Sequence, residues 1–183
     1  MSMNTKEFRR LVWEILEPVD SEVFQLVRAQ AASEEEIAEV EAATGIRLPE
    51  YFAGFVNSQG NCNGLAVFAR EEVWPAPKEY SVGPAWTFWR GVTLLGIEVP
   101  DLPDWASITS AHEKLVAVGV KDVLPLIKVW GDGGRFWGVN SSGATVVVLD
   151  SEVTILNCDL NDVYAEQITG LIQRQHDMAA RHK

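Results

Sequence analysis

The chain has 183 residues, of which 47% are hydrophobic, and this is typical of one globular domain that buries a proper core. It carries 26 acidic and 15 basic residues, so its formal net charge is −11 and its pI is about 4.7. Because binding to a nucleic-acid backbone depends on lysine and arginine side chains that displace counterions, this balance argues against a direct nucleic-acid partner. An acidic surface either keeps a protein in solution or attracts a basic protein partner, and both interpretations stay open.

No segment indicates export or membrane insertion. The opening residues, MSMNTKEFRR, lack the apolar run of a signal peptide, and no apolar run of about 18 residues occurs anywhere. We therefore expect a cytoplasmic protein without membrane contact. The two cysteines, Cys62 and Cys158, are far apart in sequence, and the three histidines are scattered, so we expect no metal site and no cofactor.

The first 30 residues show helical patterns. Apolar residues at helical spacing predict an amphipathic helix over residues 5–16, which ends before Pro18. Val23, Phe24 and Val27 predict a second short helix. We interpret residues 1–30 as an extra helical segment in front of the rest of a single domain that spans residues 1–183.

The stretch SEEEIAEVEAATGIRLP, residues 33–49, contains the signals of a complete short helix. Ser33 and Glu36 have the spacing of a capping box, in which each side chain bonds the other's backbone N–H. Gly45 suits the left-handed residue that ends a helix, and Pro49 is a favoured first residue of the next one. The expected outer face is acidic and is a candidate partner-binding surface; it consists of Glu34, Glu35 and Glu39.

After Gly64 the pattern changes from helical to extended. Short β-rich runs occur at residues 65–69, 92–97, 123–130, 135–140, 144–150 and 153–157. Glycine-containing hairpin turns are expected at 131–134 and 141–143. Helices are expected over residues 104–118 and from Asp159 to the fraying end DMAARHK. This order predicts an α+β domain with a mostly antiparallel sheet of about five or six strands and with the helices packed on one side.

The first block of the sequence resembles the signature of the SUKH superfamily, whose founding members are the Smi/Knr cell-wall regulators of fungi. In that signature an acid-capped helix carries Ile and, four residues later, Glu, and a glycine turn, Leu-Pro, an aromatic helix and Asn-Gly follow. The matching positions here are Ile37, Glu41, Gly45, Leu48, Pro49, Phe52, Phe55 and Gly60.

A second block, VLPLIKVWGDGGRFWGVN, is similar to the downstream motif of the same family, and the resemblance covers about residues 30–175. Three positions depart from the family pattern, because Tyr51, Gln59 and Asn140 stand where an acid, Asn and Asp are usual. None of these motifs is catalytic in the family. The resemblance implies a Smi/Knr-like fold and a bacterial immunity protein that binds and blocks a toxin. Many toxins paired with this family are nucleases or nucleic-acid deaminases, which tend to be basic.

Glu41 has two interpretations. It is either a solvated helix acid or a partly buried one that is tied to a nearby backbone N–H or an arginine, since a buried charge needs a partner.

The sequence indicates no catalytic residues. His112 has no nucleophile or second ligand at a suitable spacing, and Cys62 lies in a polar loop, so we expect both to be structural and the protein not to be an enzyme.

Seven tryptophans give further candidates for partner contacts. Trp86 and Trp89 lie in a Pro/Gly-rich insertion at about residues 71–91. The rings of these two tryptophans either anchor a partner or fold back onto the sheet. Trp130 directly precedes the expected turn at 131–134, and Asp132 lies in it. The ring of Trp130 is placed where it could pair with that of Trp137 across the hairpin.

Two functions of the binding class therefore compete. The first is a non-catalytic SUKH immunity protein that neutralises a toxin domain, such as a nuclease or nucleic-acid deaminase. The second is a Smi/Knr-like housekeeping scaffold or regulator whose protein partner is not a toxin.

Overall fold

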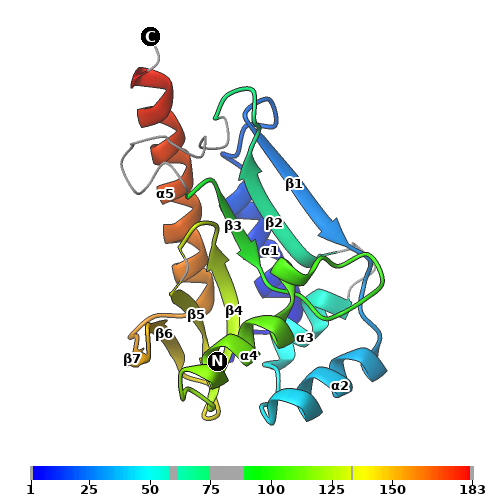
Figure 1. The fold of residues 1–183 in the computed structure, drawn as a ribbon. Helices are drawn as coiled ribbons and strands as arrows, with labels where there is room; N and C mark the ends of the chain where they lie inside the picture. Colours follow the sequence, from blue (N-terminus) through cyan, green and yellow to red (C-terminus); the bar gives the residue numbers. More distant parts are fainter. Residues whose placement is uncertain (1, 58–61, 75–88, 133, 182–183) are drawn as a thin grey trace.

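The computed structural model describes residues 2–57, 62–74, 89–132 and 134–181 (Figure 1). Its elements in chain order are α1 (Thr5–Leu16), β1 (Phe24–Ala29), α2 (Glu34–Thr44), α3 (Glu50–Asn57), β2 (Asn63–Ala69), β3 (Gly91–Leu94), the 3₁₀ turn η2 (Asp104–Ala106), α4 (Ile108–Ala117), β4 (Val123–Val129), β5 (Arg135–Asn140), β6 (Thr145–Leu149), β7 (Glu152–Ile155) and α5 (Leu160–Arg181). Gly60 of the first sequence block and Trp86 of the insertion lie outside the described residues.

The described strands form one seven-stranded antiparallel sheet in the order β1-β2-β3-β4-β5-β6-β7. Every strand therefore pairs with its neighbour in the chain, and β1 and β7 are the two edges. The predicted α+β class and the antiparallel sheet are confirmed, and each of the six predicted extended runs overlaps a strand. The prediction of hairpin links holds for β4 to β7, whereas α2 and α3 separate β1 from β2, and η2 and α4 separate β3 from β4. The predicted number of strands is one too low, because β1 joins the sheet.

The prediction of a second helix near residues 23–31 is wrong. A side-chain oxygen of Asp20 accepts a hydrogen bond from the backbone N–H of Glu22 at 2.9 Å and forms a turn, after which the chain runs as β1. Phe24 and Leu26 pair with Ala69 and Val67 of β2. A short apolar run is compatible with the spacing of a helix and with the alternation of a strand. Here the hydrogen bonds to β2 stabilise the strand. Residues 1–30 are thus not an extra helical segment, since their second half belongs to the sheet.

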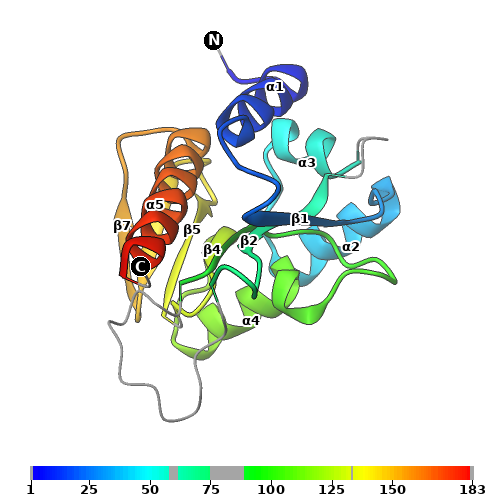
Figure 2. The ribbon, with the colours of Figure 1, turned by 90° about the horizontal axis from the view of Figure 1, so that it is seen from above.

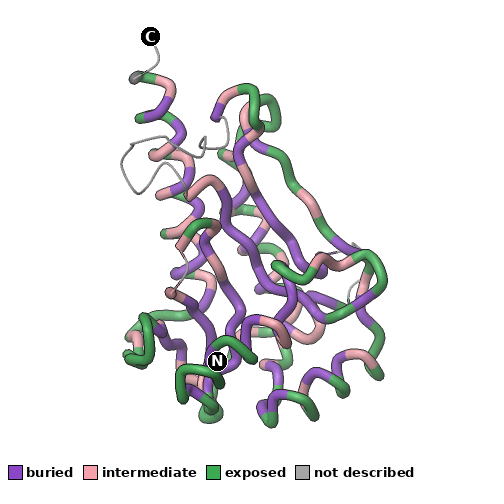
Figure 3. The backbone as a smooth tube through the Cα atoms, in the orientation of Figure 1, coloured by how far each residue is buried: buried purple, intermediate pink, exposed green. Residues whose placement is uncertain are grey.

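The helices cover both faces of the sheet, so the prediction that they lie on one side is wrong. Figure 2 shows α1, α3 and α5 on one side and α4 on the other. The reason lies in the central strands: all four residues of β3 and six of the seven in β4 are buried (Figure 3). A strand with apolar residues on both faces needs cover on both.

The stretch from Ser33 to Pro49 folds as its capping signals predict. The Ser33 Oγ accepts a hydrogen bond from the Glu36 N–H at 3.1 Å, and a Glu36 carboxylate oxygen accepts one from the Ser33 N–H at 2.8 Å. Gly45 ends α2 with φ = 73°. The half-buried Glu41 carboxylate accepts a hydrogen bond from the Leu48 N–H at 3.0 Å, which selects the tied rather than the solvated interpretation.

An aromatic cluster joins α1 to α3. The ring of Phe8 lies 4.9 Å from that of Tyr51, 6.1 Å from that of Phe52 and 5.2 Å from that of Phe55, measured between centroids. α1 also packs against α5, so the first and last helices meet on the same side of the sheet (Figure 2). The apolar residues at the motif positions of the first sequence block are all buried; they are Ile37, Leu48, Phe52 and Phe55.

Two helix predictions need correction. The helix expected over residues 104–118 is divided at Ser107, whose Oγ caps α4 by accepting a hydrogen bond from the Ser110 N–H. The expected fraying of DMAARHK is not seen in residues 177–181, because α5 continues to Arg181 and Met178 is buried, while residues 182–183 lie outside the described residues.

Candidate functional site

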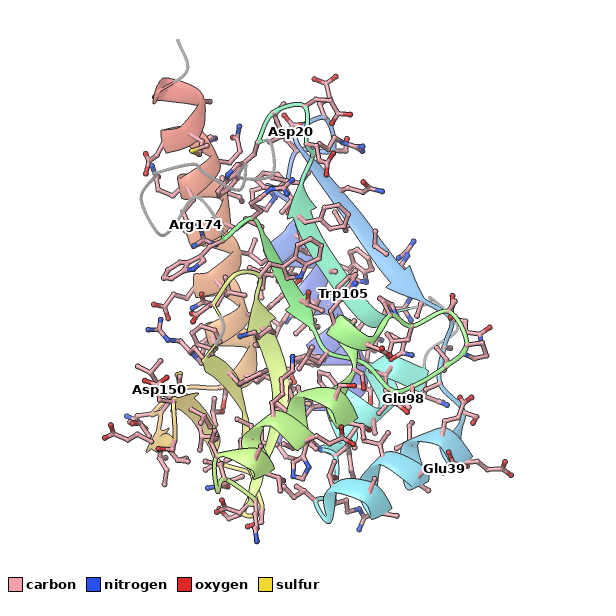
Figure 4. All side chains as sticks on the ribbon, in the orientation of Figure 1. Asp20, Glu39, Glu98, Trp105, Asp150 and Arg174 are labelled. Carbon is pink, nitrogen blue, oxygen red and sulfur yellow. The ribbon has the colours of Figure 1, made fainter. Side chains whose placement is uncertain are left out.

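The acidic face of α2 is formed by Glu34, Glu35 and Glu39, and all three side chains are exposed. Figure 4 shows Glu39 projecting away from the molecule. Within the described residues the two ion pairs are Arg10–Glu14 and Asp132–Arg135, so none of the three acids has a cationic partner. Residues 1–60, which contain this face, hold 11 acidic and five basic residues.

Trp89 folds back onto α5 and is not a free anchor. Its backbone carbonyl accepts a hydrogen bond from Arg174 Nε at 3.0 Å, and the guanidinium carbon lies 5.9 Å from the centre of the indole ring. Burial lowers the pKa of Arg174. In Figure 4 Arg174 and Glu39 lie at opposite ends of the molecule, so Trp89 and the acidic face do not form one surface.

Asp132 is likewise unsuited to a central contact. Only 11% of its side chain is exposed, and one carboxylate oxygen lies 3.7 Å from Arg135 Nε. The expected pairing of Trp130 with Trp137 is also wrong, because Trp137 lies near the guanidinium of Arg135, with 5.8 Å between the guanidinium carbon and the ring centre.

Trp130 instead belongs to a cluster of three rings. Its ring is stacked on Phe68 with centroids 4.8 Å apart and meets the edge of Trp105 at 4.9 Å. Its Nε1–H donates a hydrogen bond to Thr93 Oγ1 at 2.7 Å. The indole can lie this close to β3 because residue 91 is glycine: a Cβ there would come within 2.8 Å of the Trp130 ring.

A cavity of about 340 Å³ opens beside this cluster, between α4 and the sheet face that α4 covers. We call it the aromatic cleft. Trp105 stands at its mouth with 47% of its surface exposed, which is unusual for the largest side chain. The lining residues used below are Leu95, Trp105, Lys114, Lys128, Trp130 and Phe136.

Lys128 brings a charged group into the apolar part of this cleft. Its Nζ lies 4.3 Å from the centre of the Phe136 ring and donates one hydrogen bond, to the Arg135 carbonyl oxygen at 3.1 Å. Burial lowers the pKa of Lys128 to about 8, the nearby Asp132 opposes this, and Lys114 and Arg135 lower the pKa further.

His112 and Cys62 are the residues that the sequence raises as candidates for catalysis, and both are buried. His112 is buried, and its Nε2 lies 3.4 Å from the Lys121 carbonyl oxygen. Cys62 is buried, whereas Cys158 is exposed and its thiol pKa is raised by desolvation and by the carboxylates of Asp162, Glu166 and Asp159. In the part of the chain that is described, no group of three or more His, Cys, Asp or Glu side chains is placed to hold a metal ion.

Sequence reasoning found Trp130 but missed the cleft around it. The sequence places Trp105 only within the helix expected over residues 104–118, and its pattern does not single out Lys128, the one charged residue in the run VLPLIKVW. That lysine is the signal that was available, because a charge within a strand buried on both faces needs a special environment. Phe136 and Lys114 carry no such signal, since only the tertiary fold brings them to Lys128.

Comparison of the chain with models of known protein families found no match, and comparison with curated proteins found none either. Within the described residues, no helix has both the length and the apolar composition needed to cross a membrane.

Proposed function

We propose that this protein is a non-catalytic immunity protein of the SUKH type, which binds and neutralises a basic toxin domain in the cytoplasm of the cell that makes it. The observation that carries the proposal is the acidic face of α2: three exposed carboxylates without cationic partners in the described residues, on a rigidly capped helix. Such a face attracts a positively charged partner over a distance and speeds its capture.

The local geometry of the first sequence block supports the likeness to this family. Gly45 adopts the left-handed conformation that the glycine turn requires, and Glu41 holds the backbone of the following Leu-Pro turn through Leu48. These contacts orient α2 and α3 and leave the acidic face free. A structural role for the motif agrees with a protein that binds rather than catalyses.

The proposal is tested by co-expression with the product of a neighbouring gene that is toxic when expressed alone. We expect the chain to restore growth and to co-purify with the toxic product. If neither occurs for any toxic neighbour, the immunity function is wrong. Stable co-purification with a neighbour that is not toxic would favour the scaffold or regulator of the same fold.

The role of the acidic face is tested by the triple substitution Glu34→Lys, Glu35→Lys and Glu39→Lys. The association rate with the immobilised toxin should fall at least tenfold at low salt, and the difference should shrink when the salt concentration rises. Glu34 and Glu35 lie in the first turn of α2, where acids stabilise a helix by about 0.3–1 kcal/mol each, so thermal denaturation must show that the variant is folded at the assay temperature.

A matched control changes the net charge equally but elsewhere. Glu152→Lys, Glu166→Lys and Asp177→Lys alter exposed acids of β7 and α5, which lie away from α2 in Figure 1. We expect this variant to associate much faster than the α2 variant. Equal rates for the two variants would mean that only the net charge matters and that this face is not the steering surface.

A further inference from the structure

The aromatic cleft has the size and the walls of a small-molecule site. Its volume of about 340 Å³ lies within the roughly 300–1,000 Å³ that such sites occupy. Three aromatic rings line it, and they come from three separate elements: Trp105 from η2, Trp130 from the end of β4 and Phe136 from β5. A flat apolar group would find ring surfaces to pack against here.

The charge of the cleft is opposite to that of the molecule. Two lysines, Lys114 and Lys128, line it in a protein whose net charge is −11. Neither belongs to the two ion pairs found among the described residues, and Asp132, whose charge acts on Lys128, is paired with Arg135. Lys128 is half-buried and Lys114 is exposed. Asp104 also lines the cavity, so the lining carries two positive charges and one negative charge.

Lys128 also has hydrogen-bonding capacity to spare. An ammonium group has three donors, and within the described residues the Lys128 Nζ donates one hydrogen bond, to the Arg135 carbonyl. Its methylene stem and the Phe136 ring beneath the amine orient Nζ within the cleft. A ligand carboxylate would supply both the missing counter-charge and the missing acceptor.

We propose that the aromatic cleft binds a small organic monoanion of the aromatic carboxylate class. The ring of the ligand packs against Trp105 and Trp130, and its carboxylate accepts hydrogen bonds from Lys128 with support from Lys114. Asp104 lines the same cavity, so its repulsion disfavours ligands that carry more than one carboxylate. This site is separate from the acidic face of α2 and does not depend on the proposed immunity function.

The test uses the full chain and two ligands of equal shape, 1-naphthoate and its neutral amide 1-naphthamide, with binding measured by calorimetry at pH 7. Naphthoate should bind saturably and at least tenfold more tightly than naphthamide. Lys128→Met should weaken naphthoate binding at least tenfold and leave naphthamide binding unchanged. Trp105→Ala removes an exposed wall and should weaken the binding of both ligands.

Lys121→Met is the matched control, because Lys121 is an exposed lysine outside the cleft. It should bind naphthoate like the unaltered protein. Since the pKa of Lys128 is about 8, naphthoate affinity should also fall as the pH rises through 8, while naphthamide affinity stays constant. The charged groups around this amine are Asp104, Lys114, Asp132 and Arg135.

Three results would overturn the proposal. They are the absence of saturable naphthoate binding up to millimolar concentration, equal affinity for the acid and the amide, and equal loss of naphthoate binding in Lys121→Met and Lys128→Met. Circular dichroism of each variant establishes that it is folded before its affinity is compared.

Discussion

Tyr164 is fully buried on α5, and within the described residues its hydroxyl group has no hydrogen-bond partner. Burial raises the pKa of this phenol well above its usual value, so the group stays neutral. A buried hydroxyl that has given up water without gaining a partner destabilises the folded state, whereas the ring itself stabilises the core. In this single residue the packing of the ring therefore stabilises the folded protein, while the unpaired hydroxyl group destabilises it.

Tyr164→Phe removes the hydroxyl and keeps the ring. We expect the free energy of unfolding to stay the same or to rise by about 1 kcal/mol, measured by urea denaturation. Tyr164→Leu is the control, since it removes ring volume and should lower the free energy. A loss of more than about 1 kcal/mol in Tyr164→Phe would mean that the hydroxyl has a partner.

Lys128 makes stability depend on pH. Its pKa is about 8 in the folded protein and near 10.5 when the side chain is unperturbed, so between these values the unfolded chain binds the extra proton. Stability must then rise as the pH increases through this window. Lys128→Met should lose that rise, as shown by thermal denaturation at pH 7.5 and 10. Parallel pH dependences of the two proteins would contradict the lowered pKa.

At the scale of elements, helix ends and turns were predictable because their signals lie within a few residues. Strand pairing and the aromatic cleft, which depend on residues far apart in the chain, were not predictable. The capping box, Gly45 and the hairpin glycines act within a few residues, and the sequence places them correctly. The pattern of β1 also fits a helix, and only its pairing with β2, whose partner residues lie 34 to 45 positions later in the chain, distinguishes the two. The aromatic cleft was missed for the same reason: Trp105, Lys128 and Phe136 meet only after η2, β4 and β5 have packed.

The end of α2 provides a test of the local signals. Gly45 has φ = 73°, and a Cβ there would touch nothing within 4 Å, so any cost of Gly45→Ala comes from the backbone conformation alone. We expect a loss of about 1–2 kcal/mol in the free energy of unfolding.

Gly170→Ala is the matched control. Gly170 lies inside α5 without a positive φ, and a new Cβ would meet only the guanidinium of Arg174, which lies 3.1 Å away and would shift by a few tenths of an ångström. The same substitution should be neutral or stabilising there, because alanine favours the helix by about 1 kcal/mol. If both variants lose equal stability, the left-handed conformation of Gly45 is not what makes glycine necessary.

At the scale of the whole molecule, charge and apolar surface are separated. The acidic face lies on α2 at one end, the exposed Trp105 lies on the side covered by α4, and α1 and α5 close the opposite side (Figures 2 and 4). A large basic partner and a small anionic ligand would thus meet different parts of the protein.

The meeting of α1 with α5 has a further consequence for the order in which the chain folds. Each sheet pairing closes a connection between neighbouring strands, whereas α1 must find a helix at the other end of the chain. The entropic cost of closing so long a loop delays that contact until the sheet has formed. Val12→Ala, in the buried face of α1, should therefore speed unfolding and hardly slow folding in stopped-flow measurements. A slowed folding rate would place α1 in the folding nucleus, whereas an unchanged folding rate would mean that α1 docks after the sheet has formed.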